Sequence, residues 1–111
     1  MLNYSSTLDG AFKALADPTR RAIVDRLSRG PASLSALAEP FAMSLPAVHQ
    51  HLEVLEEAGL TISEKQGRVR WCRVNAKGMG MVEDWIVNRR RLWEARLDAL
   101  DAHLARDGRR K

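Results

Sequence analysis

The segment from Met43 to Val74 constrains the fold of this chain more than any other part of the sequence. Ser44 can cap a helix through its hydroxyl group, and Pro46 is tolerated in a first helical turn. Gly59 suits the left-handed residue that follows a helix. Apolar residues at helical spacing define one side of this helix: Val48, Leu52 and Leu55. The sequence therefore predicts a helix over residues 44–58 with one side against a core.

Two strands joined by a tight turn are predicted directly after this helix, within residues 60–74. Gln66-Gly67 is a turn signal between Lys65 and Arg68. The hairpin is basic, because no acidic residue follows Glu64 within it. A helix followed by a basic hairpin is typical of a winged helix-turn-helix. We predict a mainly α fold of about five helices plus a two-stranded wing.

Three further helices are predicted before this segment. Leu8, Ala11, Phe12 and Leu15 recur at helical spacing over about residues 6–16. Asp17-Pro18 is a helix-start signal, and the helix that follows has an apolar side of Ile23, Val24 and Leu27. Ser33 can cap a short third helix that Pro40 limits. Residues 33–58 then form a helix-turn-helix, whose second helix is the candidate for entering a DNA groove.

The C-terminal part is predicted to hold one long helix. Residues 75–80 contain two glycines and no hydrophobic pattern, which indicates a connector before a helix from about Met81 to Ala105. Its apolar stripe could pack on the first helix, on its counterpart in a second subunit, or on both. The candidate dimer-interface residues are Leu8, Phe12, Trp85, Ile86, Trp93, Leu97, Leu100 and Leu104. Residues 106–111 are expected to form a basic, frayed tail of this single domain, 1–111.

The composition is that of one globular domain. The 111 residues are 45% hydrophobic and 29% charged, and the net charge of +4 permits but does not require a polyanionic partner. Cys72 is the single cysteine, which excludes an intrachain disulfide and fits a reducing compartment. No apolar run is long enough for a membrane span, and the N-terminus lacks a basic segment followed by an apolar one. We expect a cytoplasmic protein without membrane contact.

The sequence resembles the ArsR/SmtB family of winged-helix repressors from about Leu8 to Val74. The matching segments are Leu15-Ala16-Asp17-Pro18-Thr19-Arg20-Arg21, Pro46-Ala47-Val48, His51-Leu52, Val54-Leu55, Ala58-Gly59-Leu60 and Gly67-Arg68. The residues Trp85, Arg90, Trp93 and Arg96-Leu97-Asp98 also look like a subgroup with a long C-terminal helix and no metal site. The resemblance implies a homodimer that binds operator DNA and blocks transcription, often of its own operon.

The DNA-binding candidates lie on the helix and on the hairpin. On the helix they are Ser44, Leu45, Pro46, His49 and Gln50, and on the hairpin Lys65, Arg68 and Arg70. Gln50 is the best candidate for base readout, because a Gln amide pairs bidentately with adenine. His49, where the family often has serine, would contact a base or a phosphate.

Long cations on a hairpin beside a groove-binding helix reach the flanking backbone or the minor groove. Two further cations, Arg20 and Arg21, are open to two interpretations. They would contact a phosphate, or pair within the chain with Asp17 or Asp25.

Other functions have weaker support. Metal-sensing relatives often carry paired cysteines on the third helix, where this chain has Ser33-Leu34-Ser35-Ala36-Leu37-Ala38, and Asp101 and His103 do not share a helix face. We expect no metal site, no cofactor and no catalytic residues, because no nucleophile lies beside a base. Cys72 is interpreted as a core thiol rather than a redox switch. The alternative function is a protein-interaction module on the same fold. No effector is identified.

Overall fold

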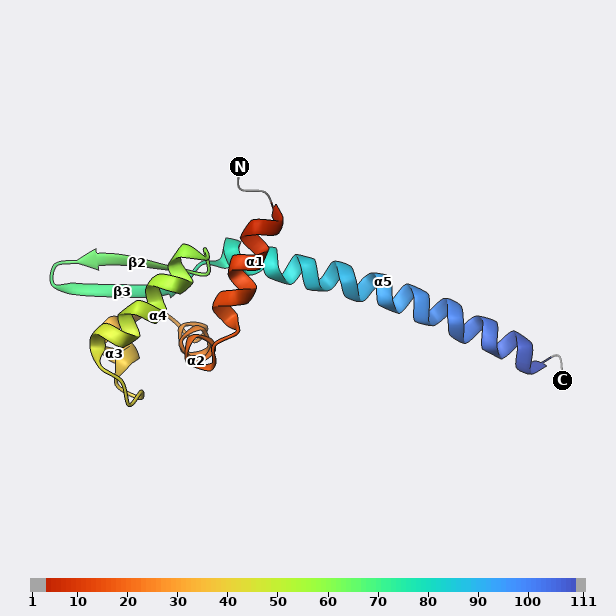
Figure 1. Cartoon of the computed structure of the whole chain (residues 1–111), viewed down its shortest axis with the longest axis horizontal. Helices are drawn as coiled ribbons and strands as arrows, with labels where there is room; N and C mark the ends of the chain where they lie inside the picture. Colours follow the sequence, from red (N-terminus) through yellow and green to blue (C-terminus); the bar gives the residue numbers. More distant parts are fainter. Residues whose placement is uncertain (1–3, 110–111) are drawn as a thin grey trace. The chain divides into compact units, whose positions relative to one another are not determined.

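The computed structural model describes residues 4–109, and they divide into two compact units, within residues 1–81 and 82–111 (Figure 1). The first unit holds helices, a small sheet and the beginning of the last helix. Its elements are α1 (Tyr4–Leu15), α2 (Pro18–Leu27), β1 (Ala32–Ser33), α3 (Leu34–Ala38), α4 (Leu45–Glu57), β2 (Thr61–Gln66) and β3 (Val69–Val74). The last helix, α5 (Ala76–Arg109), continues into the second unit. The predicted winged helix-turn-helix with five helices is confirmed.

Side-chain caps begin three of the helices where the sequence predicted them. The Asp17 carboxylate accepts a hydrogen bond from the Arg20 backbone N–H at 3.0 Å, at the start of α2. Ser33 accepts from the Ala36 N–H at 3.1 Å to begin α3. Ser44 accepts from the Ala47 N–H at 3.3 Å to begin α4. Each cap satisfies a backbone donor that the helix itself leaves unpaired.

The sheet has three antiparallel strands in the order β1-β3-β2, one more than the predicted two-stranded wing. The two-residue strand β1 pairs Ala32 with Cys72 and is too short to show an alternating pattern in the sequence. The hairpin turn is Gly67-Arg68 and not Gln66-Gly67, because Gln66 pairs with Val69 inside the ladder. Gly67 has a φ of 65°, whereas Arg68 does not have a positive φ, since only glycines do among the described residues. A positive φ at the first turn residue alone is typical of a type II′ turn.

The core of the first unit gathers around α4. Val48, Leu52 and Leu55 are fully buried, as their spacing predicted, and α4 contacts α1, α2, α3 and β2. The other fully buried large side chains are Ile23, Leu37, Leu60 and Cys72. Because every neighbour packs on one side of α4, the opposite side of that helix is left exposed.

The predicted connector over residues 75–80 is wrong, because α5 already begins at Ala76. Asn75 leads into the helix, and its side-chain amide donates a hydrogen bond to the Gly59 carbonyl at 2.9 Å. Gly78 faces the same carbonyl, and a Cβ atom there would lie 1.8 Å from the Gly59 oxygen. Gly78 is therefore a helical glycine that permits close approach, and not a helix breaker.

The second unit is the remainder of α5. The helix extends through Arg109 and so continues beyond its predicted end at about Ala105 into the segment predicted as a basic tail, while Arg110 and Lys111 lie outside the described residues. Along residues 82–109 the polar side is stabilised by pairs one helical turn apart, such as Arg90 with Glu94 at 3.7 Å. Within residues 4–109, none of the helices combines the length and the hydropathy that crossing a bilayer requires.

Candidate nucleic-acid interface

The first two turns of α4 present a mostly exposed polar surface. Ser44, Leu45, Pro46 and Gln50 are exposed, whereas His49 is half-buried. The Nδ1 atom of His49 lies 3.3 Å from a carboxylate oxygen of Glu53, one turn further along the helix. Because the buried residues of α4 lie on the other side, these five predicted DNA-binding residues remain free of the core.

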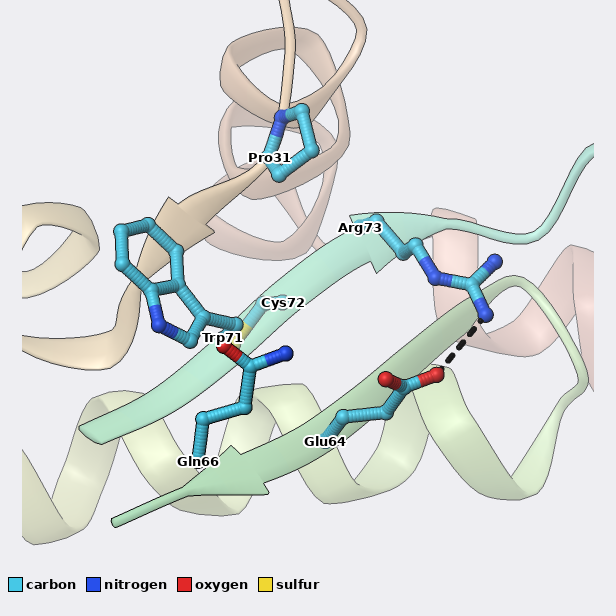
Figure 2. Close-up of a pocket in the computed structure, with 6 residues that line it drawn as sticks. All are labelled: Pro31, Glu64, Gln66, Trp71, Cys72 and Arg73. Carbon is cyan, nitrogen blue, oxygen red and sulfur yellow. Dashed lines mark hydrogen bonds and ion pairs between the residues drawn. The ribbon is translucent and has the colours of Figure 1, made fainter. Parts of the chain in front are cut away.

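The wing has two faces of different chemistry. The strand register pairs Ser63 with Cys72 and Lys65 with Arg70, and side chains alternate between the faces of a sheet. These four side chains therefore lie on one side of the hairpin. This side packs on α4, and we call it the inner face. The opposite, outer face carries Glu64, Gln66, Trp71 and Arg73 (Figure 2). The predicted cations Lys65 and Arg70 are therefore cross-strand neighbours on the same face as α4.

Arg68 occupies the hairpin turn and is exposed. In Figure 1 the tip of the hairpin and the beginning of α4 both lie at the left of the view. The structure thus brings the three wing cations to the end and the inner face of the hairpin. Arg73, the fourth basic residue of the hairpin, points to the other face and pairs with Glu64 at 3.1 Å.

A polar link that the sequence pattern did not indicate joins α4 to the wing. The Ser63 hydroxyl on β2 donates a hydrogen bond to the Glu56 carboxylate on α4. The same hydroxyl lies 3.7 Å from the Cys72 sulfur. A carboxylate on a helix and a hydroxyl on the next strand have no characteristic spacing, so no local signal could have identified the pair. This hydrogen bond helps to hold the inner face of the wing against α4.

Arg20 and Arg21 both bond to backbone carbonyls within the chain, and the charge of Arg20 also helps to lower the pKa of the carboxyl of Asp17, one of its predicted partners. The Arg20 Nε donates to the Ala14 carbonyl at 2.6 Å, and the Arg21 Nη1 donates to the Leu15 carbonyl at 2.8 Å. These carbonyls lie at the C-terminal end of α1, where cations are favoured. Arg20 also lies 3.3 Å from the Nδ1 of His51, a half-buried residue of α4. Both arginines therefore join α1 to α2, and Arg20 also joins them to α4.

Cys72 lies inward on β3, as the alternation of the strand predicted. Its side chain has no exposed surface, and burial raises the pKa of the thiol. A raised pKa disfavours the reactive thiolate at neutral pH. The environment is that of a core thiol.

Within the described part of the chain, no group of three or more His, Cys, Asp or Glu side chains could hold a metal ion. His103 lies 3.2 Å from the Asp107 carboxylate on the surface of α5. Its side chain is 62% exposed.

The predicted dimer-interface residues differ in exposure. Leu8 is buried within the first unit, and Phe12 is 38% exposed. On α5, Trp93 is 65% exposed, and the exposed stripe continues through Ile86, Leu97, Leu100 and Leu104. Trp85 is half-buried and lies under the Arg89 guanidinium, 4.8 Å from the centre of its ring. A large apolar surface of this kind usually marks an interaction site.

An exposed helix inside a helix-turn-helix, next to a wing whose inner face carries cations, is the arrangement of a winged helix-turn-helix DNA-binding regulator. Residues 15–64 match the protein family described as a helix-turn-helix domain. HTH-type transcriptional regulator Rv2034 of Mycobacterium tuberculosis is 45% identical over 79 residues, which cover 71% of this chain and 73% of that protein.

Transcriptional repressor SdpR of Bacillus subtilis is 31% identical over 81 residues, which cover 73% of this chain and 90% of that protein. The crystal structure of the ArsR family transcriptional regulator RHA00566 superposes with a TM-score of 0.76. It is 49% identical and covers 85% of this chain and 97% of that one. The chain belongs to the ArsR family of winged helix-turn-helix transcriptional regulators.

Proposed function

We propose that this regulator is a homodimeric repressor that binds an inverted-repeat operator, including one in its own promoter. The observation that carries the proposal is the exposed side of α4, which holds Gln50 and lies on the same side of the wing as Lys65 and Arg70. A helix that exposes hydrogen-bonding side chains can read base edges in the major groove, while nearby cations contact the backbone. SdpR, which is similar over most of its length, is named a repressor.

Each candidate residue has a separate role in this proposal. Gln50 reads a base, and Ser44, Leu45 and Pro46 bring the beginning of α4 close to the groove. His49 contacts a base or a phosphate with the ring nitrogen that does not face Glu53. Lys65, Arg68 and Arg70 bind the flanking backbone or minor groove and contribute affinity without sequence preference.

The apolar stripe of α5 supports the dimer. Ile86, Trp93, Leu97, Leu100 and Leu104 are each at least 47% exposed in the single chain. Pairing with the same surface of a second subunit would bury them, since twofold interfaces use one patch twice. Phe12 of α1, which is 38% exposed, remains a candidate for contact with the second subunit, whereas Leu8 contributes through packing inside its own unit.

Footprinting of the promoter of the protein's own gene tests the proposal. Two recognition helices on one face of a duplex protect half-sites about 34–36 Å apart, as an imperfect inverted repeat. If about 6–10 phosphates are contacted, affinity falls by roughly a thousandfold or more between 50 and 200 mM salt. Absence of salt-sensitive, sequence-specific protection in that promoter would reject autoregulation. If no specific DNA can be selected from a random pool either, a protein-interaction module becomes the better explanation.

A further inference from the structure

The outer face of the wing holds a pocket that the proposed function does not use. Its volume is about 280 Å³, and it is lined by Pro31, Glu64, Gln66, Trp71 and Arg73, with the fully buried Cys72 below its surface. Figure 2 shows Trp71, Gln66, Glu64 and Arg73 on one side of the two strands, with Pro31 at the entrance to β1. All of these residues belong to the first unit.

The walls of the pocket are an indole and a proline ring. Trp71 is 41% exposed, although its backbone lies in the central strand of the sheet between Ser33 of β1 and Glu64 of β2. The strand therefore holds an aromatic surface in a fixed position and leaves part of it open. Flat apolar groups stack favourably on such a ring.

The polar end of the pocket is electrically balanced. Glu64 and Arg73 form an ion pair at 3.1 Å, and their side chains are 57% and 49% exposed. The pair cancels the charge of each partner but leaves further N–H donors on Arg73 and a second carboxylate oxygen on Glu64. The Gln66 amide adds a neutral donor and acceptor. A ligand with a net charge would gain from one member of the pair and be repelled by the other.

The charge of this face also separates it from the DNA-binding residues. Lys65 and Arg70 lie on the inner face, whereas the Arg73 cation on the outer face is neutralised by Glu64 and offers phosphate no net attraction. The outer face is thus unsuited to a nucleic-acid backbone. A pocket of this size, slightly below the usual range of about 300–1,000 Å³ for ligand sites, matches a molecule with one or two rings.

We propose that the outer face of the wing binds a small neutral aromatic molecule that carries a hydrogen-bonding group, such as an aromatic amide. The ring stacks on Trp71 beside Pro31. The polar group of the ligand exchanges hydrogen bonds with Gln66 and with the Glu64–Arg73 pair.

Three probes of the same shape and different charge test this site: benzamide, benzoate and benzylamine. Each is titrated into the full chain, and the indole N–H signal of Trp71 is followed by NMR, after assignment with the Trp71→Phe variant. Benzamide is expected to shift this signal and to bind more tightly than either charged probe. Trp71→Ala lacks this reporter, so its binding is followed through the side-chain amide signal of Gln66, and it should weaken benzamide binding by about tenfold, the scale of one lost aromatic contact.

Two charge variants make the test specific. Glu64→Gln leaves Arg73 uncompensated and should change the preference to benzoate, whereas Arg73→Gln should change it to benzylamine. Val69→Ala is the matched control, because Val69 lies on the same face but does not line the pocket. Unchanged preferences in both charge variants would overturn the proposal, as would benzamide shifts confined to the Trp93 signal. Displacement of benzamide from Trp71 by a mixed-sequence duplex at low ionic strength would assign this face to DNA and equally overturn it.

Discussion

Gln50 lies in the second turn of α4 with its side chain exposed, while Val48 and Leu52 on the other side of the helix are fully buried. The helix is thus held by residues that do not take part in recognition. A change at Gln50 should consequently affect DNA binding with little effect on folding.

Gln50→Ala is expected to weaken operator binding by about 1–3 kcal/mol per half-site and to relax specificity at one base pair of each half-site, because a bidentate contact is lost there. Fluorescence anisotropy with operator and with random duplex measures both effects. Gln66→Ala is the matched control, since it removes the same side chain from the outer face of the wing. Equal losses on the two duplexes for Gln50→Ala would reject the assigned role.

Asp17 offers a test of a structural residue. The hydrogen bond from the Arg20 backbone N–H lowers the pKa of the Asp17 carboxyl below its ordinary value of 3.8. A lowered folded-state pKa stabilises the protein above the unfolded-state value, and this contribution is lost as the pH falls through the folded-state value. Asp17→Asn keeps a capping side chain but cannot titrate. The free energy of unfolding of the variant should therefore change less between neutral pH and about pH 3 than that of the natural protein. Parallel pH curves for the two proteins would contradict this assignment.

At the scale of elements, the junction between the end of α4 and the beginning of α5 depends on a missing side chain. A Cβ atom at Gly78 would overlap the Gly59 carbonyl, whereas one at Gly80 would meet no atom within 4 Å. The two glycines lie in the same turn of the same helix, so replacing either with alanine should give a similar gain in helix propensity. They differ only in the atoms that surround them.

Gly78→Ala is expected to destabilise the protein by about 1–3 kcal/mol, because overpacking exceeds the gain in helix propensity. Gly80→Ala should instead stabilise it by up to about 1 kcal/mol. Urea unfolding followed by circular dichroism measures both. Stabilisation by both substitutions would show that the Gly59 carbonyl can move away at little cost.

The wing is the second element with a testable division of roles. Arg68 in the turn should contact DNA, whereas Arg73 on the outer face pairs with Glu64. Arg68→Ala is expected to weaken binding to all sequences alike and to reduce the salt dependence by about one unit of slope for each subunit of the dimer. Arg73→Ala, which removes the same charge, should have the smaller effect. A larger loss for Arg73→Ala in salt-dependent anisotropy titrations would reverse the assignment of the two faces.

For the whole molecule, the state of assembly is the main prediction. Sedimentation should give twice the chain mass of 12.5 kDa. Leu97→Glu places a carboxylate in the apolar stripe and is expected to produce monomers, because burying an unpaired charge is costly. Ala95→Glu adds the same group on the opposite side of α5 and should leave the dimer intact. A dimer that survives Leu97→Glu would place the interface elsewhere.

The sequence predicted much of the first unit because the signals were local. The caps Asp17, Ser33 and Ser44 each act on a backbone N–H three residues away, and the buried side of α4 follows from helical spacing. The exposure of Ser44 and Gln50 follows in the same way, since the core occupies the other side of the helix.

The features that were missed depend on contacts distant in the sequence. From the sequence alone, Gly78 indicates a connector and not a helix. The reason for a glycine there is the Gly59 carbonyl, which comes from the end of another helix and leaves no local signal. The two-residue strand β1 exists only through its pairing with Cys72 and Trp71 on β3. The alternation of side chains along the strands places Lys65 and Arg70 on the same face of the wing. Only the packing of the wing on α4 shows that this is the inner face.

The order of the strands places β2 at an open side of the sheet, where backbone groups of Thr61–Gln66 face away from β3. Such a border can recruit strands from other molecules and start aggregation. Glu64 and Lys65 lie along it, and stacking identical copies there would bring like charges together. We therefore expect these two side chains to oppose in-register pairing of identical edges at high protein concentration.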